Sequence, residues 1–323
     1  MSGRILLCTI DCSAMAPCTK DHRTMSRRSF LSSLALLLAG CVSNPWGKTS
    51  GLSIGSKNFT EQLVLGELLA QYLGRSTALP INKRFYLAGS YICHQALLAG
   101  RIDMYVEYTG TALVAILKQA PSSDHAAVFN TVKDLYSRKF GLEVLPSLGF
   151  DNTFAMVMRG NDARRLRLKT LSDAAAVSPQ LRLGVGYEFL ERPDGYKGLA
   201  SKYGLKFTEA PRVMDLGLLY RALQNKQVDL VAGSNTDGLI AALDLVVLED
   251  DLHYFPPYDA VPIVRRATLE RHPEVAAALR RLSGRITAED MRRMNYAVDG
   301  EKRDAAMVIR DFIAQKMAAG TSI

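Results

Sequence analysis

From residue 52 onward, short apolar runs alternate with segments in which apolar residues recur at helical spacing, and these two patterns predict strands and helices in turn. Short apolar runs at residues 52–55 and 104–106 predict buried strands, whereas the helical spacing of apolar residues over 61–73 predicts an amphipathic helix. Asn58, three residues before Glu61, has the form of a capping box for that helix. We expect further strands at residues 81–87, 142–145, 154–159, 181–185, 206–209, 228–232, 245–248 and 261–264. We expect further helices at residues 91–99, 112–118, 126–140, 169–177, 195–203, 216–225, 239–243, 267–283, 287–296 and 300–318. This alternation predicts an α/β protein with helices covering its sheets.

The first 40 residues have a different character and are set apart from the fold. A twin arginine in residues 26–31 (SRRSFL) precedes an apolar run at 34–39 and then residues 38–41 (LAGC). This is the layout of a secretory signal peptide, and the apolar run is too short to span a membrane. The arginine pair resembles a twin-arginine export signal, and LAGC resembles a lipobox in which Cys41 is lipidated. We therefore expect a signal peptide at 1–40, with Met25 as an alternative start, and a tether at 41–51. The mature protein would be exported to the periplasm or cell surface and lipid-anchored.

Charge and cysteine content argue against two classes of protein. Five of the 40 Lys and Arg and two of the 32 Asp and Glu lie in the first 40 residues, so the net charge falls from +8 to +5. With no basic run interleaved with aromatic residues, this mild charge does not indicate nucleic-acid binding. Cys93 is then the single internal cysteine, which argues against a disulfide framework and favours a small buried hydrophobe.

Sequence motifs for catalysis give no support to an enzyme. The chain has no HExxH, SxxK, Walker or CxxC pattern, and its one GxSxG match, residues 51–55 (GLSIG), places the serine inside the predicted strand 52–55 and not on a strand-to-helix turn. Gly184 and Gly186 begin a dinucleotide-binding pattern, but Phe189 occupies the position of the third glycine. The histidines lack the spacing of metal ligands; they are His22, His94, His125, His253 and His272. We predict a binding protein with no enzymatic activity, no cofactor and no metal.

Residues 103–112 (DMYVEYTGTA) offer the strongest candidate binding corner. They predict a short buried strand that enters a glycine-containing turn and then a helix. Ligands of open α/β sheets lie at the carboxyl ends of strands, beside the free N–H groups of the next helix. Tyr108, Thr109 and Thr111 place a phenol and two hydroxyls at this corner, while Tyr105 faces the opposite side because of its odd spacing.

Six short segments occur in a specific order along the chain. They are residues 55–62 (GSKNFTEQ), 107–111 (EYTGT), 189–195 (FLERPDG), 234–238 (SNTDG), 245–251 (LVVLEDD) and 255–258 (FPPY). Together they resemble the osmoprotectant-binding proteins of ABC importers, which take glycine betaine, carnitine, choline or proline betaine. The resemblance covers about residues 52–318.

The resemblance implies a cage of aromatic rings for a quaternary ammonium group. Such a group has no N–H, so aromatic faces hold it, each contributing about 0.5–2 kcal/mol. By motif, Tyr108 and Tyr258 would be cage rings, and Asn152 and Phe154 stand where the family commonly has a second tyrosine. Ser234 occupies the position of another family tyrosine. Losing one ring removes about 1 kcal/mol or more.

The resemblance also implies a clamp for a ligand carboxylate. Lys57 and Gln62 would contact the acid end from the first strand–helix turn, and Thr111 would donate a hydroxyl. Arg192 would clamp the carboxylate from the opposite lobe, since a guanidinium suits a carboxylate.

Other readings of these residues stay open. Lys57 is also compatible with a solvated turn lysine, Phe154 with plain strand core, and Arg192 with an ordinary surface arginine. Tyr91 is a candidate substitute for the missing ring. Because of Ser234, the alternative function is a receptor of the same fold for a different amine or amino acid, or one that feeds a sensor.

The implied architecture is a two-lobed periplasmic-binding-protein fold of type II, with two crossovers and a ligand cleft between the lobes. Lobe I would comprise residues 52–151 plus 259–323, and lobe II residues 152–258. The implied partners are a separate ABC permease and its ATPase, with the membrane contacted through the lipid anchor alone. We expect a monomer.

Overall fold

The computed structural model describes residues 51–318, within a compact unit that begins at Thr49. The predicted signal peptide, most of the tether and the predicted lipid attachment at Cys41 lie outside the described residues. In the described part of the chain, no helix has both the length and the apolar character needed to cross a bilayer.

The first of two five-stranded sheets has the order β2-β1-β3-β10-β4. Its strands are β1 (Leu52–Gly55), β2 (Ile81–Arg84), β3 (Met104–Tyr108), β4 (Leu142–Val144) and β10 (Ala260–Arg265). The sheet is mixed, because β1 is parallel to β2 and β3 whereas β10 is antiparallel to β3 and β4. Its helices are α2 (Thr60–Ser76), α3 (Ser90–Leu98), α4 (His125–Phe140), α11 (Arg266–Arg271), α12 (Pro273–Leu282), α13 (Ala288–Asp299) and α14 (Ala305–Ala318). A π-helical turn at Thr111–Ile116 follows β3.

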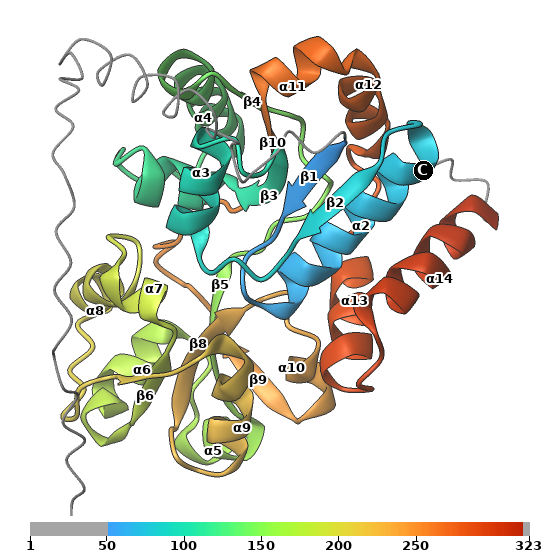
Figure 1. Cartoon of the computed structure of the whole chain (residues 1–323). Helices are drawn as coiled ribbons and strands as arrows, with labels where there is room; N and C mark the ends of the chain where they lie inside the picture. Colours follow the sequence, from blue (N-terminus) through green and yellow to red (C-terminus); the bar gives the residue numbers. More distant parts are fainter. Residues whose placement is uncertain (1–50, 319–323) are drawn as a thin grey trace, which may run out of the picture. The chain divides into compact units, whose positions relative to one another are not determined.

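The second sheet has the order β7-β6-β8-β5-β9 and is also mixed. Its strands are β5 (Phe154–Arg159), β6 (Leu183–Val185), β7 (Arg212–Val213), β8 (Leu230–Ser234) and β9 (Leu245–Leu248). Its helices are α5 (Gly160–Leu166), α6 (Leu171–Val177), α7 (Tyr187–Glu191), α8 (Tyr196–Tyr203), α9 (Leu219–Gln224) and α10 (Leu239–Ala242), with 3₁₀ turns at Ser178–Gln180 and Leu216–Leu218. We call each sheet with its helices a lobe (Figure 1).

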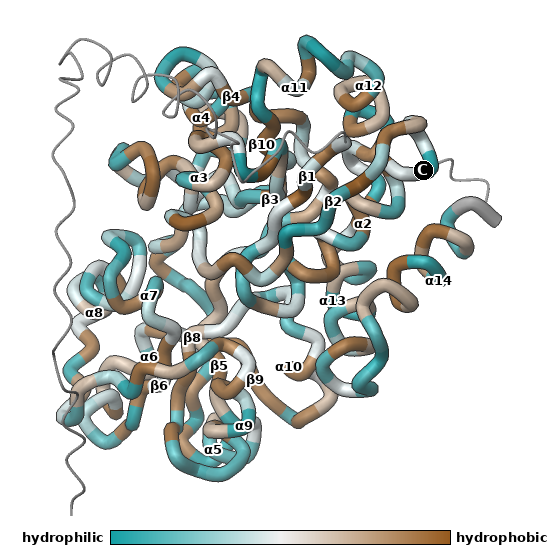
Figure 2. Tube along the Cα trace, viewed as in Figure 1, coloured by the Kyte–Doolittle hydropathy of each residue, from teal (hydrophilic) through white to brown (hydrophobic). Residues whose placement is uncertain are grey.

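Each lobe has three layers, because strand residues alternate between two hydrophobic cores. In β3, Met104 packs with α2 and α12–α14, whereas Tyr105 packs with α3 and α4. The second lobe repeats this arrangement, with α6 and α8 on one face of the sheet and α9 on the other. Figure 2 shows the matching alternation of hydrophobic and hydrophilic stretches along the helices.

The chain crosses between the lobes twice, after β4 and after β9, so β10 returns to the first sheet. Asp151 and Asp259 form an isolated antiparallel bridge where the two crossing segments run beside each other. The α/β class and the two-crossover arrangement are as predicted. The residue-level lobe boundaries remain a prediction.

Several element predictions were wrong or incomplete. Residues 206–209 are not a strand, and the edge of the second sheet is β7 instead. The helix expected at 267–283 is divided at His272, because a residue before proline avoids helical backbone angles and Pro273 starts the next helix. Helices α5 and α7 were not predicted.

The capping box predicted from Asn58 and Glu61 is also wrong. Phe59 is the N-cap residue of α2, and no side chain caps this helix. The Glu61 carboxylate accepts hydrogen bonds from other parts of the molecule instead.

Candidate functional site

A cavity of about 290 Å³ lies between the two lobes. The first lobe lines it with residues 57–59, 89–90 and Tyr108, and the second with Phe154, residues 186–189, Arg192, residues 213–216 and Ala232. Most of these positions follow a strand or begin a helix, as expected for a ligand site of an α/β sheet. Of the predicted corner at the end of β3, Tyr108 contributes to the wall of this cavity.

Lys57 follows β1 and is 2% exposed. Its ammonium group donates to the Glu107 carboxylate and, at 3.0 Å, to the Ser90 hydroxyl. Nζ also lies 4.5 Å from the centroid of the Tyr108 ring. Lys57 is therefore a buried ion-pair residue in the cavity wall, and the reading as a solvated turn lysine is wrong.

Glu107 is the buried counter-charge that sequence reasoning did not identify. Its carboxylate also accepts the hydroxyl of Tyr105 at 3.1 Å and the backbone N–H of Tyr108 at 2.8 Å. It lies inside the EYTGT segment, but its pairing with Lys57 joins positions 50 residues apart and has no sequence signal.

Arg192 enters the cavity from the second lobe, after α7. Its guanidinium makes a two-pronged ion pair with Asp194, with Nε 2.8 Å from Oδ1. Nη1 also donates to Thr111 Oγ1 of the first lobe at 2.9 Å. Burial by itself lowers the pKa of Arg192, but the Asp194 partner more than offsets this and raises it, so the group stays charged. The surface-arginine reading is wrong, since the side chain is 8% exposed.

Aromatic rings form one wall around Arg192. The guanidinium carbon lies 5.1 Å from the Phe154 ring centroid and 5.8 Å from that of Tyr258. Phe154 contacts Tyr258, Phe189 and Phe255 at centroid separations of 5.4, 4.9 and 5.6 Å. Tyr258 lies behind the lining, and its hydroxyl donates to Asp194 at 2.6 Å. Phe189, which lines the cavity, was not among the predicted site residues.

Tyr108 places its ring in the cavity wall and its hydroxyl in a separate polar network. The hydroxyl donates to Glu61 Oε1 at 2.6 Å. Burial, together with the Glu61 charge, raises the pKa of Tyr108 well above its usual value, so the phenol stays protonated as a donor.

Several predicted residues do not line the cavity. Thr111 accepts a hydrogen bond from Arg192, and Tyr258 donates one to Asp194, the partner of Arg192. Gln62 is buried on α2. Asn152 and Ser234 instead hydrogen-bond to each other at 2.7 Å and belong to the network around Glu61. Tyr91, the candidate substitute ring, is 63% exposed and is not part of the lining.

Glu188 is a further cavity residue that the sequence did not indicate. It lies on the unpredicted helix α7, and its Oε1 accepts the backbone N–H of Ser90, at the start of α3 in the other lobe, at 2.7 Å. A Cβ atom on Gly89 would lie 2.0 Å from this oxygen, so glycine permits the close approach of the two lobes.

One group of side chains in the described residues has metal-ligand spacing. It consists of His125, Asp151 and Asp259, whose ligand atoms all lie within 4.8 Å of one another. It stands at the lobe crossings, outside the cavity lining.

Comparison with known proteins gives a consistent result. Residues 50–315 match the family model described as the substrate-binding domain of an ABC-type glycine betaine transport system. The carnitine transport binding protein OpuCC of Listeria monocytogenes is 32% identical over 283 residues, covering 86% of this chain and 92% of that protein. A glycine-betaine-binding protein of Pseudomonas aeruginosa is 34% identical over 301 residues, covering 88% and 94%.

Solved structures support the same fold. A crystal structure described as a glycine betaine/carnitine/choline ABC transporter aligns with a TM-score of 0.69 and 33% identity, covering 82% of this chain and 98% of that one. This similarity confirms the two-lobed binding-protein fold predicted from the sequence. The ergothioneine transport permease/ergothioneine binding protein EgtU of Helicobacter pylori is 34% identical over 263 residues, 81% of this chain and 47% of that protein.

Proposed function

The chain belongs to the family of substrate-binding domains of ABC-type glycine betaine transport systems, and from this we propose that it binds a quaternary-ammonium solute in the cavity between its lobes. Family membership makes it a solute-binding protein and not an enzyme. One observation carries the ligand proposal: a single cavity is lined by aromatic rings and by two buried cations, Lys57 and Arg192.

The ammonium end would lie against the rings. A quaternary ammonium is attracted to aromatic faces by their quadrupoles, and enclosure strengthens the attraction by limiting competition from water. Tyr108, Phe154 and Phe189 line the cavity and supply such faces. The Lys57 ammonium already stands at one face of Tyr108, so the ligand would use the remaining ring surfaces.

The carboxylate end would lie against Arg192. Of its five N–H donors, the bonds to Asp194 and Thr111 use three, which leaves one on each terminal nitrogen. The Asp194 pair holds the guanidinium plane in place, so the entropic cost of ordering it is met before ligand arrives. Lys57 retains one N–H beyond its bonds to Glu107 and Ser90.

We propose that the protein works outside the cytoplasm and passes its ligand to a permease driven by a separate ATPase. The SRRSFL segment and the LAGC segment that ends at Cys41 support export and lipid anchoring. A monomer suffices for this role, because both walls of the cavity come from one chain.

A different ligand of the same class is the second candidate. Ser234 stands where the family resemblance implies a tyrosine, and its side chain bonds to Asn152 and not into the cavity. One relative is named as an ergothioneine-binding protein, so a bulkier betaine is a reasonable alternative to glycine betaine.

Isothermal titration of the purified protein with glycine betaine, carnitine, proline betaine, choline and ergothioneine tests the proposal. We expect saturable heat with at least one of them. In Arg192→Gln, which keeps a long polar side chain, the carboxylate-bearing ligands should lose roughly tenfold or more in affinity, while choline should lose much less. Arg165→Ala, an arginine 66% exposed on α5, is the matched control.

Two results would contradict the proposal. No heat with any of the five compounds at millimolar concentration would leave only the family fold and point to another solute. An equal loss of choline and carboxylate ligands in Arg192→Gln would remove the clamp role from Arg192.

A further inference from the structure

Glu61 has an unusual environment for an acidic side chain. It is 2% exposed, yet none of its hydrogen-bond partners in the described residues is a lysine or arginine. Oε1 accepts the Tyr108 hydroxyl at 2.6 Å and the Asn152 amide, and Oε2 accepts the Thr236 hydroxyl at 2.5 Å and the Asn295 amide at 3.0 Å. Four neutral donors and the N-terminal turn of α2 therefore stabilise the buried charge.

These donors come from separate parts of the protein. Glu61 and Asn295 belong to α2 and α13 of the first lobe, whereas Thr236 follows β8 of the second. Asn152 lies on the crossing segment just before β5. Asn295 also donates to the backbone carbonyl of Thr236 at 3.0 Å, so the same loop is held twice. One carboxylate thus bonds to both lobes and to the connection between them.

The loop after β8 also packs directly against α13 of the first lobe. A Cβ atom on Gly238 would lie 2.4 Å from the backbone nitrogen of Tyr296 on α13, so this loop approaches the first lobe as closely as glycine allows. The polar bonds of Thr236 therefore lie beside direct packing between the lobes.

The network also reaches the cavity through Tyr108. The hydroxyl of this residue is bonded to Glu61, while its ring lines the cavity. A ring with its hydroxyl held by a buried carboxylate has little freedom to turn away from the cavity. Glu61 itself is not part of the lining.

We propose that Glu61 is a positioning residue for ligand binding: it orients the Tyr108 ring and, through Thr236, holds the lobes together. The effect on affinity rests on the proposed function, whereas the effect on the contact between lobes does not. A carboxylate is needed because each of its oxygens accepts two bonds. Glutamine would present N–H₂ to two of the four donors.

The test compares Glu61→Gln with Glu67→Gln, a second buried carboxylate on the same helix. The donors to Glu67, Lys83 and Gln71, both belong to the first lobe. We expect Glu61→Gln to weaken glycine betaine binding roughly tenfold to a hundredfold, in line with the loss of bonds to a charged acceptor. We expect Glu67→Gln to bind as the unchanged protein does.

Hydrogen exchange of the full chain, followed by mass spectrometry without ligand, gives an independent readout. Glu61→Gln should speed amide exchange in residues 235–239 and 290–297, while residues 230–233 of β8 and all segments of Glu67→Gln keep their protection. General loss of structure would speed exchange in β8 as well, and that result would overturn the proposal.

Tyr108→Phe completes the test, because it keeps the ring and removes the bonded hydroxyl. If Glu61 acts through this hydroxyl, the affinity loss of the double variant should be smaller than the product of the two single losses. Independent losses would overturn the positioning role. If the unchanged protein binds none of the five compounds, the proposed function fails, and the exchange data alone then decide whether Glu61 joins the lobes.

Discussion

Individual residues around the cavity owe their positions to carboxylates that make no contact with it. Lys57 is paired with Glu107 and Arg192 with Asp194, and all four side chains are almost fully buried. Removing one partner of a buried pair leaves an uncompensated charge, which costs about 3–5 kcal/mol. Both cations are therefore held firmly, and a ligand carboxylate meets donors that are already oriented.

Asp237, in the loop after β8, carries a prediction for the effect of pH on stability. Burial raises its pKa to about 7, although the Tyr220 hydroxyl and the Ser234 N–H donate to it, and the negative charges of Glu61 and Asp299 add to the rise. An unfolded aspartate has a pKa of about 3.9. Between roughly pH 4 and pH 7 the folded protein keeps a proton that the unfolded chain releases, so the free energy of unfolding falls as pH rises through this window.

Urea unfolding at a series of pH values between 4.5 and 8 measures this effect. Asp237→Asn stays neutral and can still accept both hydrogen bonds, so we expect it to remove roughly 2–4 kcal/mol of the decline across the window. Parallel stability curves for the two proteins would mean that Asp237 is ionised in the folded state.

Single elements explain most of what the sequence could and could not predict. Regular apolar spacing predicted the ends of α4 to within one residue and those of α2 to within three, because each helix buries one continuous face. Helix α7 was missed because five residues are too few to show a helical period. Because α7 was not predicted, neither Glu188 nor Phe189, which both lie on it, was identified as a cavity residue.

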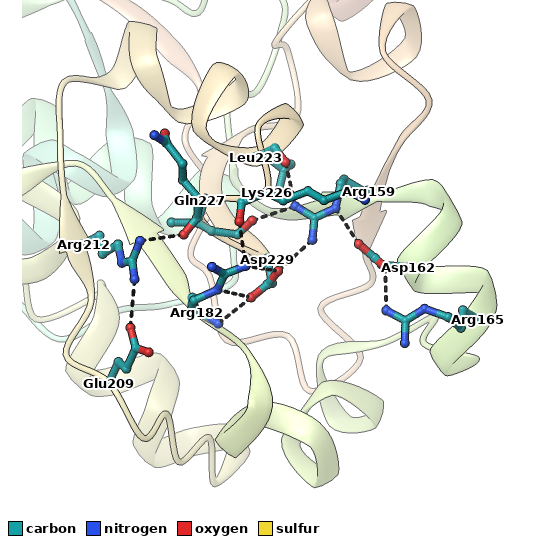
Figure 3. Close-up of polar contacts among 11 residues, drawn as sticks. Arg159, Asp162, Arg165, Arg182, Glu209, Arg212, Leu223, Lys226, Gln227 and Asp229 are labelled. Atoms are coloured by element: carbon teal, nitrogen blue, oxygen red, sulfur yellow. Dashed lines mark hydrogen bonds and ion pairs between the residues drawn. The ribbon is translucent and has the colours of Figure 1, made fainter.

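Three strands of the second sheet are joined by a charge network (Figure 3). Asp229, just before β8, accepts bonds from Arg159 at the end of β5 and from Arg182 just before β6. Burial alone would raise the pKa of Asp229, but these two guanidinium groups outweigh it and lower the pKa to about 2. Arg159 also donates to the backbone carbonyls of Leu223 and Val228.

We expect Asp229→Asn to lower the free energy of unfolding by roughly 1–3 kcal/mol near pH 7, since it removes the charge on which both arginines converge. Because the folded pKa is depressed, this contribution is present above about pH 4 and is lost as pH falls toward 2. Asp244→Asn is the control, since Asp244 is 62% exposed in its pair with Arg164 and should change stability little. Equal effects of the two variants in urea unfolding would contradict a structural role for the network.

For the whole molecule, the alternation of strands and helices predicted the α/β class. The two-lobed fold was predicted from the family resemblance of the ordered motifs. These motifs also identified Lys57, Tyr108, Phe154 and Arg192, which line the cavity. They did not reveal the role of Glu61, because its partners lie between 47 and 234 residues away in the chain. Short motifs predict local structure and chemistry, whereas the contacts that join two lobes depend on three-dimensional packing.

The two lobes share the cavity and should therefore respond to ligand as one unit. Strand β10, which lies between β3 and β4 in the first sheet, follows the second lobe in the sequence, so the second lobe is inserted into the first. A ligand at 100 times its dissociation constant stabilises the folded state by about 2.7 kcal/mol. In calorimetric unfolding we expect one transition that moves upward with glycine betaine. At the same ligand concentration a tenfold weaker Arg192→Gln would be stabilised by about 1.4 kcal/mol, so its transition should move about half as far or less. Two transitions, of which the ligand shifts only one, would show that a single lobe holds the ligand and that the cavity between the lobes is not where it binds.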